Sequence, residues 1–237
     1  MNLDRFLCKQ ASYSRKTVLR LLSQQQVKVD GHIVHHRSTP ITKFSLIEVQ
    51  GEVIQHTTPQ YYMLNKPAGL LSATSDPIHP TVLELFTEMK RANLHIAGRL
   101  DRATTGLLIV TNDGKWSRKL TELKPFGAQQ IPKVYLVETA YALSPTTAQR
   151  FAEGIYFKTE EVTTSPAQLE VISEKTSRLT IYEGRYHQVK RMYAAVGNRV
   201  VALHREKVGN ITLEPKLKLG EFRALTEREI SWVFTDS

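Results

Sequence analysis

The sequence predicts an α+β fold in two parts: a small N-terminal helix–hairpin module over residues 1–58, and a larger domain over residues 59–237. The stretch 50–60 is polar, contains a glycine and a proline and has no hydrophobic periodicity, which is typical of a linker. Beyond it, several strand-like segments follow one another without a helix between them. This order favours a mixed, mainly antiparallel sheet with flanking helices over a doubly wound parallel sheet.

The first module is predicted to contain two helices and a hairpin. Leu3, Phe6 and Leu7 have helical spacing, and Ser14 is a good N-cap for a second helix. That helix places its apolar residues at positions 18, 21 and 22 on one face. The pair Asp30-Gly31 between two alternating segments predicts a hairpin, because both turn positions favour positive φ. A strand over 46–49 closes the module.

The larger domain alternates between the two periodicities. Strands are predicted at 61–64, 95–97, 106–111, 134–139, 169–172 and 179–181. Helices are predicted at 81–90, 115–123, 145–151 and from Gln188 onward. The segment 226–229 reads as a capping box that opens a final helix.

Charge and composition narrow the class of function. The chain has 32 Lys and Arg against 23 Asp and Glu, and residues 1–58 alone carry eight basic and four acidic residues. Such a surplus favours a polyanionic partner, although a merely soluble basic protein remains an alternative. Cys8 is the single cysteine, which excludes an intrachain disulfide and fits a reducing, cytoplasmic compartment. Unbroken apolar runs such as Leu107–Val110 are far shorter than the roughly 18 residues of a membrane span, so we expect no membrane partner.

Three segments could carry chemistry. Asp101 lies in a predicted loop between two apolar strands, flanked by Arg99 and Arg102, which would favour its ionised form. Tyr135 lies on a strand and could either pack in the core or stack on a nucleobase. The segment 183–192 collects cations, an amide and an imidazole at a strand-to-helix junction, which indicates an anion-binding cluster or a solvated helix start.

Familiar cofactor motifs are absent from the sequence. It has no Gly-x-x-x-x-Gly-Lys loop and no Gly-x-Gly-x-x-Gly fingerprint, the usual marks of nucleotide hydrolases, dehydrogenases and Rossmann-type methyltransferases. His32, His35 and His36 have no convergent cysteine or acidic cluster, so a metal site there is not expected. We therefore expect neither a metal nor a cofactor.

The N-terminal module resembles the alpha-L motif, a small RNA-binding module. The matching segments are Leu3-Asp4-Arg5-Phe6-Leu7, Ser14-Arg15-Lys16 and Val27-Lys28-Val29-Asp30-Gly31. A basic helix beside a small hairpin can follow an A-form backbone through phosphate and shape contacts. On this resemblance, Arg15, Lys16 and Arg20 are expected to bind RNA.

The chain resembles pseudouridine synthases of the branch that modifies small-subunit (16S) ribosomal RNA, from its N-terminal module to residues 225–230. The resemblance is carried by four segments in order: Asn65-Lys66-Pro67-Ala68-Gly69, Gly98-Arg99-Leu100-Asp101 with Thr105-Gly106-Leu107, Lys133-Val134-Tyr135, and Glu183 to Met192. It implies that a uridine is isomerised without a cofactor, with Asp101 acting at C1′ or on the base and Tyr135 lying against the base. Lys190 stands where other branches have an arginine that pairs with the aspartate, so we predict an Asp101–Lys190 ion pair.

The same resemblance also implies which residues contact RNA and which partner is bound. Arg99, Arg185 and Arg191 are expected to be available for RNA phosphates. The expected partner is small-subunit ribosomal RNA or an assembly intermediate, bound by a monomer. Three alternatives stay open: a synthase acting on large-subunit ribosomal RNA, a non-catalytic rRNA-binding assembly factor, and an RNA methyltransferase, against which the missing glycine-rich loop argues.

Overall fold

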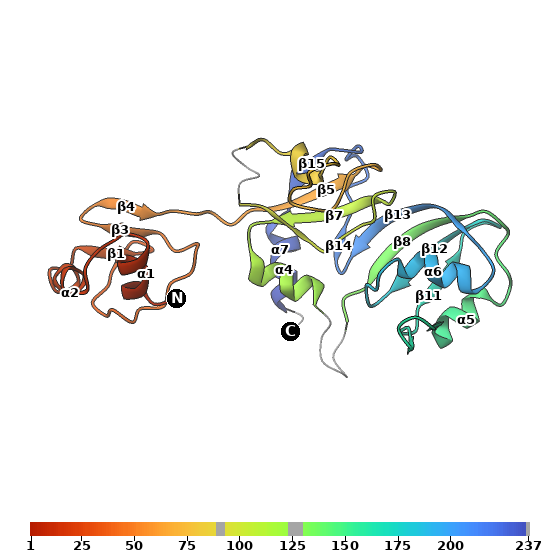
Figure 1. Ribbon diagram of the computed structural model, residues 1–237, viewed down its shortest axis with the longest axis horizontal. Coiled ribbons are helices and arrows are strands. Elements are labelled where there is room, and N and C mark those ends of the chain that lie inside the picture. Colours follow the sequence, from red (N-terminus) through yellow and green to blue (C-terminus); the bar gives the residue numbers. More distant parts are fainter. Residues whose placement is uncertain (89–92, 123–129, 236–237) are drawn as a thin grey trace. The chain divides into compact units, whose positions relative to one another are not determined.

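The computed structural model describes residues 1–88, 93–122 and 130–235, which divide into two compact units, Met1–Pro59 and Gln60–Ser237 (Figure 1). The boundary falls at Pro59 within the polar stretch 50–60. Each unit has a core of its own. In the described residues, no helix is long and apolar enough to cross a membrane.

The first unit packs two helices on a small antiparallel sheet. Its elements are α1 (Leu3–Lys9), α2 (Arg15–Ser23), β1 (Val27–Val29), β2 (His32–Ile33), β3 (Ile47–Val49) and β4 (Glu52–Gln55), with strand order β2-β1-β3-β4. Ser14 caps α2 by accepting a hydrogen bond from Thr17 N at 3.1 Å. Asp30 and Gly31 turn the hairpin with φ of 52° and 80°. The predicted helices and hairpin are confirmed.

The expected linker is wrong in its first half. Residues 52–55 form β4, which pairs antiparallel with β3 and belongs to the first unit. The strand has no clear alternation because it lies at the edge of the sheet, where backbone pairing requires no apolar face. Gln55 Nε2 fixes it further by donating to the carbonyl oxygens of Thr42 and Ser45 at 3.0 and 2.8 Å.

The second unit is built on one mixed sheet. Its strands in chain order are β5 (Tyr61–Lys66), β6 (His95–Ala97), β7 (Thr105–Thr111), β8 (Lys133–Thr139), β11 (Gln168–Val171), β12 (Thr176–Ile181), β13 (Val200–Val208), β14 (Ile211–Thr212) and β15 (Phe222–Ala224). The main path runs β11-β12-β8-β13-β7-β5-β15, with β6 beside β7 and β14 beside β13. A separate pair joins β9 (Tyr156–Phe157) to β10 (Val162–Thr163). Among the described strands of the sheet, only β7 and β13 pair in parallel, which confirms a mixed, mainly antiparallel sheet.

One side of β7 changes partner along its length. β6 pairs with residues 109–111 of β7, and β13 pairs with Thr105 and Gly106. The chain that leaves β6 is therefore displaced from the sheet where β13 enters, and it continues as the loop 98–104. The loop that carries Asp101 thus lies at a junction of strands in the middle of the sheet.

Helices cover the sheet. They are α4 (Gly114–Thr121), α5 (Thr147–Glu153), α6 (Gln188–Ala195) and α7 (Glu227–Thr235), and α4 and α7 pack against each other. Along β7, Leu108 and Val110 belong to one apolar cluster, and Leu107 and Ile109 to another on the opposite face. The predicted capping box is confirmed, because Thr226 N donates to Glu229 Oε2 at 2.8 Å.

Two expectations about elements need correction. Residues 82–85 form a single 3₁₀ turn, η1, and not the start of an α-helix over 81–90, because the chain is extended at Phe86, whose ring stacks on Phe222 at 4.1 Å. The longest strand, β13, was not predicted, since His204, Arg205, Glu206 and Lys207 break its apolar pattern. The predicted helix ends at Lys90 and Leu123 lie outside the described residues.

Candidate active site

The loop that carries Asp101 is held by the segment that follows β5. Ser72 Oγ donates to Leu100 O at 2.8 Å and accepts from Leu100 N at 3.1 Å. Gly69 N donates to Arg102 O at 2.8 Å, and Arg102 Nε donates back to Gly69 O at 3.0 Å. These bonds fix the backbone on both sides of Asp101 and leave its carboxylate out of the anchoring.

Lys66 completes this anchor from within the core. Its side chain is fully buried, and Nζ donates to the carbonyl oxygens of Pro67, Arg102 and Thr104 at 2.9, 3.2 and 3.0 Å. Burial lowers the pKa of Lys66 to about 8, although the nearby charge of Asp101 opposes this shift. Lys66 stands in the segment 65–69 that the resemblance includes, but its role could not be predicted, because two of its three partners are backbone atoms of a distant loop.

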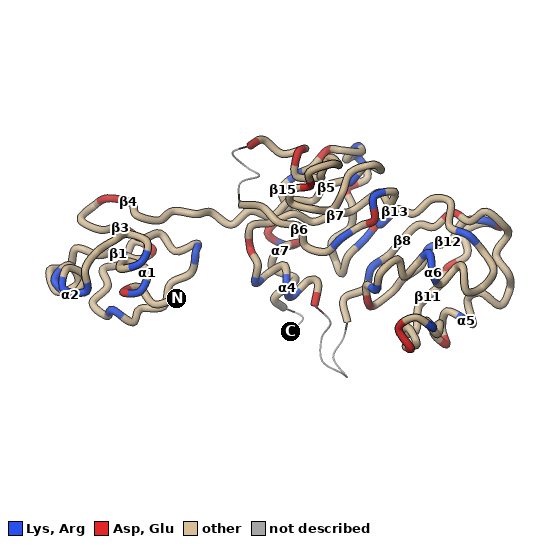
Figure 2. Tube along the Cα trace, viewed as in Figure 1, with Lys and Arg blue, Asp and Glu red and all other residues tan. Residues whose placement is uncertain are grey.

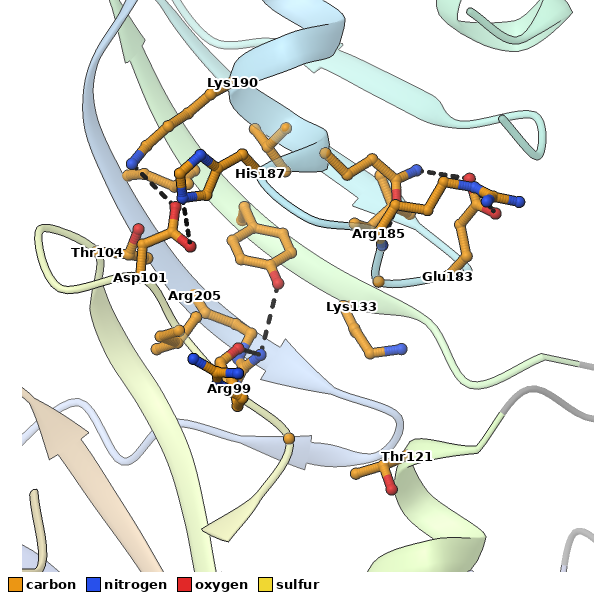
Figure 3. A pocket seen from close by; sticks show the side chains of 18 residues that line it. Arg99, Asp101, Thr104, Thr121, Lys133, Glu183, Arg185, His187, Lys190 and Arg205 are labelled. Carbon is orange, nitrogen blue, oxygen red and sulfur yellow. Dashed lines mark hydrogen bonds and ion pairs between the residues drawn. The ribbon is translucent and has the colours of Figure 1, made fainter. Parts of the chain in front are cut away.

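Two side chains from the start of α6 approach the Asp101 carboxylate. Lys190 Nζ lies 2.9 Å from Oδ2, and His187 Nε2 lies 3.4 Å from Oδ1 (Figure 3). His187 and Lys190 are three residues apart, so they share a face at the start of α6. The His187 ring stacks on Tyr186 with centroids 3.9 Å apart. The predicted Asp101–Lys190 ion pair is confirmed.

Asp101 opens into a pocket of about 400 Å³. Tyr135, on β8, lines this pocket and is 7% exposed. Tyr135 Oη lies 3.5 Å from Nη1 of Arg205, which can donate to it. The pocket therefore joins the Asp101–Lys190 pair to Tyr135, as the resemblance implied for these three residues.

Arg205 forms the floor of the pocket and was missed by the sequence analysis. It lies on β13 and is 3% exposed, and its Nε donates to Leu107 O at 2.8 Å. Gly106 makes this approach possible, because a methyl group there would collide with the backbone of Arg205. The alternation of Leu203 and Arg205 along β13 is the signal that could have found it, had β13 been recognised as a strand.

A second carboxylate, Glu183, lies on the opposite side of the pocket from Asp101. Its Oε1 accepts from Ser165 N at 3.1 Å and from Gln188 Nε2 at 2.8 Å. Its Oε2 accepts from Arg185 Nε at 3.0 Å. The side chain is 4% exposed. Glu183 therefore holds together the junction between β12 and α6.

Lys133 extends into the same pocket beside Glu183 (Figure 3). It lies on β8 two residues before Tyr135. Burial lowers the pKa of Lys133 to about 8, and the charge of Arg205 lowers it further, while Glu183 acts in the opposite direction. Lys133 stands in the segment 133–135 that the resemblance includes, but the resemblance implied a role for Tyr135 alone.

The three arginines expected to contact RNA phosphates have different surroundings. Arg99 is exposed and lines the pocket. Arg185 pairs with Glu183 and with Glu160 at 3.9 Å, and Arg191 pairs with Glu160 at 2.7 Å. Arg191 also lies over the ring of Phe157 at 3.7 Å. Both guanidinium groups thus already have carboxylate partners, whose charge competes with RNA phosphate.

The basic residues expected in the first unit lie on α2. Arg15, Lys16 and Arg20 are all exposed, whereas Val18, Leu21 and Leu22 of the same helix are buried (Figure 2). The opposite face of α2 packs into the core of this unit. In the described part of the chain, no group of three or more His, Cys, Asp or Glu residues could hold a metal ion.

Comparison with known proteins gives the family. The sequence model for RNA pseudouridylate synthases matches residues 60–195. A relative from Yersinia pestis, named ribosomal small subunit pseudouridine synthase A, is 47% identical over 98% of this chain and 98% of its own. The chain belongs to the RNA pseudouridylate synthase family. Relatives of the same name from Pseudomonas aeruginosa and Escherichia coli K12 are 46% and 45% identical, over 97% and 98% of this chain and 99% and 100% of theirs.

A solved structure titled as a pseudouridylate synthase has the same fold. It superposes with a TM-score of 0.71 at 39% identity, and covers 98% of this chain and 99% of its own. This chain is thus a pseudouridine synthase, and the pocket with Asp101 lies within the part of the second unit that the family matches.

Proposed function

We propose that this pseudouridine synthase converts a uridine of small-subunit (16S) ribosomal RNA to pseudouridine, with Asp101 as the reacting carboxylate. The names of its relatives support the substrate. The observation that carries the residue assignment is the Asp101–Lys190 pair, 2.9 Å across, at the mouth of the pocket. The side chain of Asp101 is 28% exposed, so incoming ribose can reach it.

The reaction breaks the bond between N1 of uracil and C1′ of ribose, turns the base, and rejoins C1′ to C5. The ionised carboxylate of Asp101 acts as a nucleophile toward C1′ or the base, or stabilises the charge at C1′. Lys190 compensates the charge of Asp101 before substrate binds, and a lysine does so as a point charge without a bidentate fork. Tyr135 lies against the base. The product is an isomer of the substrate, so the proposed reaction needs no redox cofactor.

The first unit is proposed to be an alpha-L type RNA-binding module. Arg15, Lys16 and Arg20 would contact phosphates of rRNA near the target. A uridine within folded RNA must be extruded to reach a pocket, which costs a few kcal/mol. Binding of the adjacent backbone by α2 offsets this cost. We propose that the enzyme acts as a cytoplasmic monomer on ribosomal RNA or an assembly intermediate.

Mapping of pseudouridines tests the proposed substrate. Ribosomal RNA from cells with and without the protein is compared, and purified protein is incubated with 16S transcript and with small-subunit particles. We expect one position of 16S RNA to lose its pseudouridine in cells and to regain it in vitro. A site in large-subunit RNA would overturn the target. Absence of any new pseudouridine, with rRNA binding intact, would indicate an assembly factor.

Charge reversal tests the module. Changing Arg15, Lys16 and Arg20 to Glu should weaken binding of 16S RNA and flatten its dependence on salt, because each lost phosphate contact removes part of the slope. A matched control changes Glu52, on β4 of the same unit, to Gln. Equal affinity of the triple variant and the parent from low to high salt would contradict the assignment.

A further inference from the structure

We infer that Lys133 is a further catalytic residue, which stabilises the uracil ring as an anion while the ring is detached from C1′. This inference rests on the proposed pseudouridine synthase reaction. It assigns a chemical role to a cation that the Asp101–Lys190 pair does not use.

The position of Lys133 follows from strand geometry. Lys133 and Tyr135 are two residues apart on β8, so their side chains leave the same face of the sheet. Such residues are separated by about 6.6 Å along the strand, which is close to the length of a uracil ring with its carbonyl oxygens. Asp101 and Lys133 lie on opposite sides of the pocket (Figure 3). A base lying against Tyr135 with C1′ near Asp101 therefore extends toward the ammonium group of Lys133.

Lys133 keeps its hydrogen-bonding capacity. Within the described residues, its Nζ has one acceptor, Ile131 O at a long 3.4 Å, and no carboxylate within 4.0 Å. Three other cations of the region are engaged: Lys66 by three carbonyl oxygens, Lys190 by Asp101, and Arg185 by two glutamates. Gly184 leaves room beside the stem of Lys133, since a methyl group there would lie 4.0 Å from Cε. At least one ammonium proton can therefore be donated to a ligand.

The reaction produces a charge that such a donor can stabilise. When the N1–C1′ bond breaks, the bonding pair stays on N1, and the base leaves as an anion whose charge spreads to O2 and O4. Lys133 donates a hydrogen bond to one of these oxygens without giving up its proton. Where Asp101 bonds to C1′ as N1 leaves, that bond breaks after the ring has turned and C5 supplies the electron pair for the new bond to C1′. Where Asp101 only stabilises the charge at C1′, C5 bonds to C1′ directly. One proton leaves C5 and one is gained at N1, so nothing is consumed.

The charged groups around Lys133 set the pH range in which it can act. Arg205 on β13 and Arg99 after β6 are cationic, whereas Glu183 after β12 is anionic and itself bonded to Arg185. Burial and Arg205 lower the pKa of Lys133 to about 8. The ammonium form therefore predominates at pH 7 and is lost as the pH rises through about 8.

Single-turnover rates at saturating 16S RNA test the inference. Lys133→Met should slow isomerisation by about 10- to 100-fold at pH 7, the worth of a hydrogen bond from a charged donor. Lys133→Arg should retain most of the rate. The matched control is Lys207→Met, a half-buried lysine that lines the groove on the other face of the sheet. A rate for Lys133→Met equal to that of the parent would overturn the inference.

Two further readouts separate catalysis from a structural role. The parent should lose rate above pH 8, and Lys133→Arg should move this loss to higher pH. Because Lys66 titrates in the same range, it could also cause a loss of rate above pH 8. If Lys133→Arg loses rate at the same pH as the parent, our assignment of this loss to Lys133 is wrong.

On RNA with 5-fluorouridine at the target, whose fluorine stabilises the departing anion, Lys133→Met should slow consumption less than on uridine. An equal slowing would indicate a structural role. A parent without any isomerase activity would instead disprove the proposed function itself.

Discussion

Two carboxylates on opposite sides of one pocket have contrasting surroundings. Glu183 is 4% exposed and accepts hydrogen bonds from a backbone amide, an amide side chain and a guanidinium. Asp101 is 28% exposed, and its partners are Lys190 at 2.9 Å and His187 at 3.4 Å, both near the start of α6. The oxygens of Glu183 are thus occupied by hydrogen bonds within the fold, whereas the carboxylate of Asp101 still faces the pocket.

The difference shows how the fold separates anchoring from reactivity. At Glu183 the carboxylate itself is the anchor of its loop. At Asp101 the neighbouring backbone is anchored instead, by Ser72, Gly69 and Lys66. In the proposed reaction the Asp101 carboxylate acts on the substrate, so its lone pairs must stay free of the hydrogen bonds that hold the chain. The following substitutions test this division, from the largest expected effect to the smallest.

Asp101→Asn should abolish isomerisation, with a loss of at least about 1,000-fold, because the amide keeps the shape and removes the nucleophilic charge. Affinity for 16S RNA should stay within a few-fold of the parent. Single-turnover assays and filter binding on the same preparation measure both quantities. Full turnover by the purified variant would show that Asp101 is not the reacting group.

Lys66→Met should loosen the loop without touching the carboxylate. We expect a loss of about 2–3 kcal/mol in the free energy of unfolding, because three buried carbonyl oxygens lose a donor. The rate should fall by up to about 100-fold as Asp101 is misplaced. Urea unfolding followed by tryptophan fluorescence reports on the second unit, since Trp116 and Trp232 are the only tryptophans. Parent-like stability and rate would contradict the anchoring role.

Lys66→Met should also change how the stability of the second unit depends on pH. The pKa of Lys66 is about 8 in the folded unit and 10.5 when exposed. Between these values the unfolded chain binds the additional proton, so this group makes folding more favourable as the pH rises. Lys133 contributes in the same sense. Lys66→Met should therefore reduce the rise in stability between pH 8 and 10.5, and an unchanged slope would contradict it.

Lys190→Met should reduce the rate by about 10- to 100-fold at pH 7, because a half-buried carboxylate loses its nearest cation. Lys190→Arg should be milder, since the charge is kept and only the geometry changes. Single-turnover rates at saturating RNA and filter binding measure both variants. If Lys190 only touched phosphate, the methionine variant would bind RNA more weakly and keep the rate of the parent at saturating RNA.

Glu183→Gln should have the smallest effect on rate, within about 3-fold at pH 7. The amide oxygen still accepts from Ser165 N, while Arg185 loses the nearer of its two carboxylate partners, at a cost of about 1 kcal/mol in stability. The charge of Glu183 raises the pKa of Lys133, so its removal should lower that pKa. The loss of activity at alkaline pH should therefore begin at lower pH. A loss as large as that of Asp101→Asn would remove the distinction between the two carboxylates.

Much of the site could be predicted from the sequence because its groups lie in short motifs. Asp101, Tyr135 and Lys190 each stand in a recognisable segment, and the structure brings all three to one pocket. Arg185 and Arg191 also stand in such a segment, but their shared carboxylate partner could not be predicted from it. Glu160, which pairs with both, lies in a stretch without any motif.

The remainder depends on contacts between distant parts of the chain. Lys66 bonds carbonyl oxygens 36 and 38 residues away, and Arg205 bonds one 98 residues away. Backbone acceptors have no sequence signature, so neither role could be predicted. For the same reason β4 was taken as linker: the pairing that makes it a strand leaves no mark on its side chains.

The parallel contact of β7 with β13 has a consequence for how this enzyme is made. Arg205 follows Leu107 by 98 residues, and a ribosome adds about 5–20 residues per second, so roughly 5–20 s separate the two strands. During that time one edge of β7 near Gly106 waits unpaired, and such edges pair readily with other chains. Pairings between distant segments also form slowly. Substitutions that delay the docking of β13 therefore lower the yield of folded enzyme in the cell more than the turnover of each folded molecule.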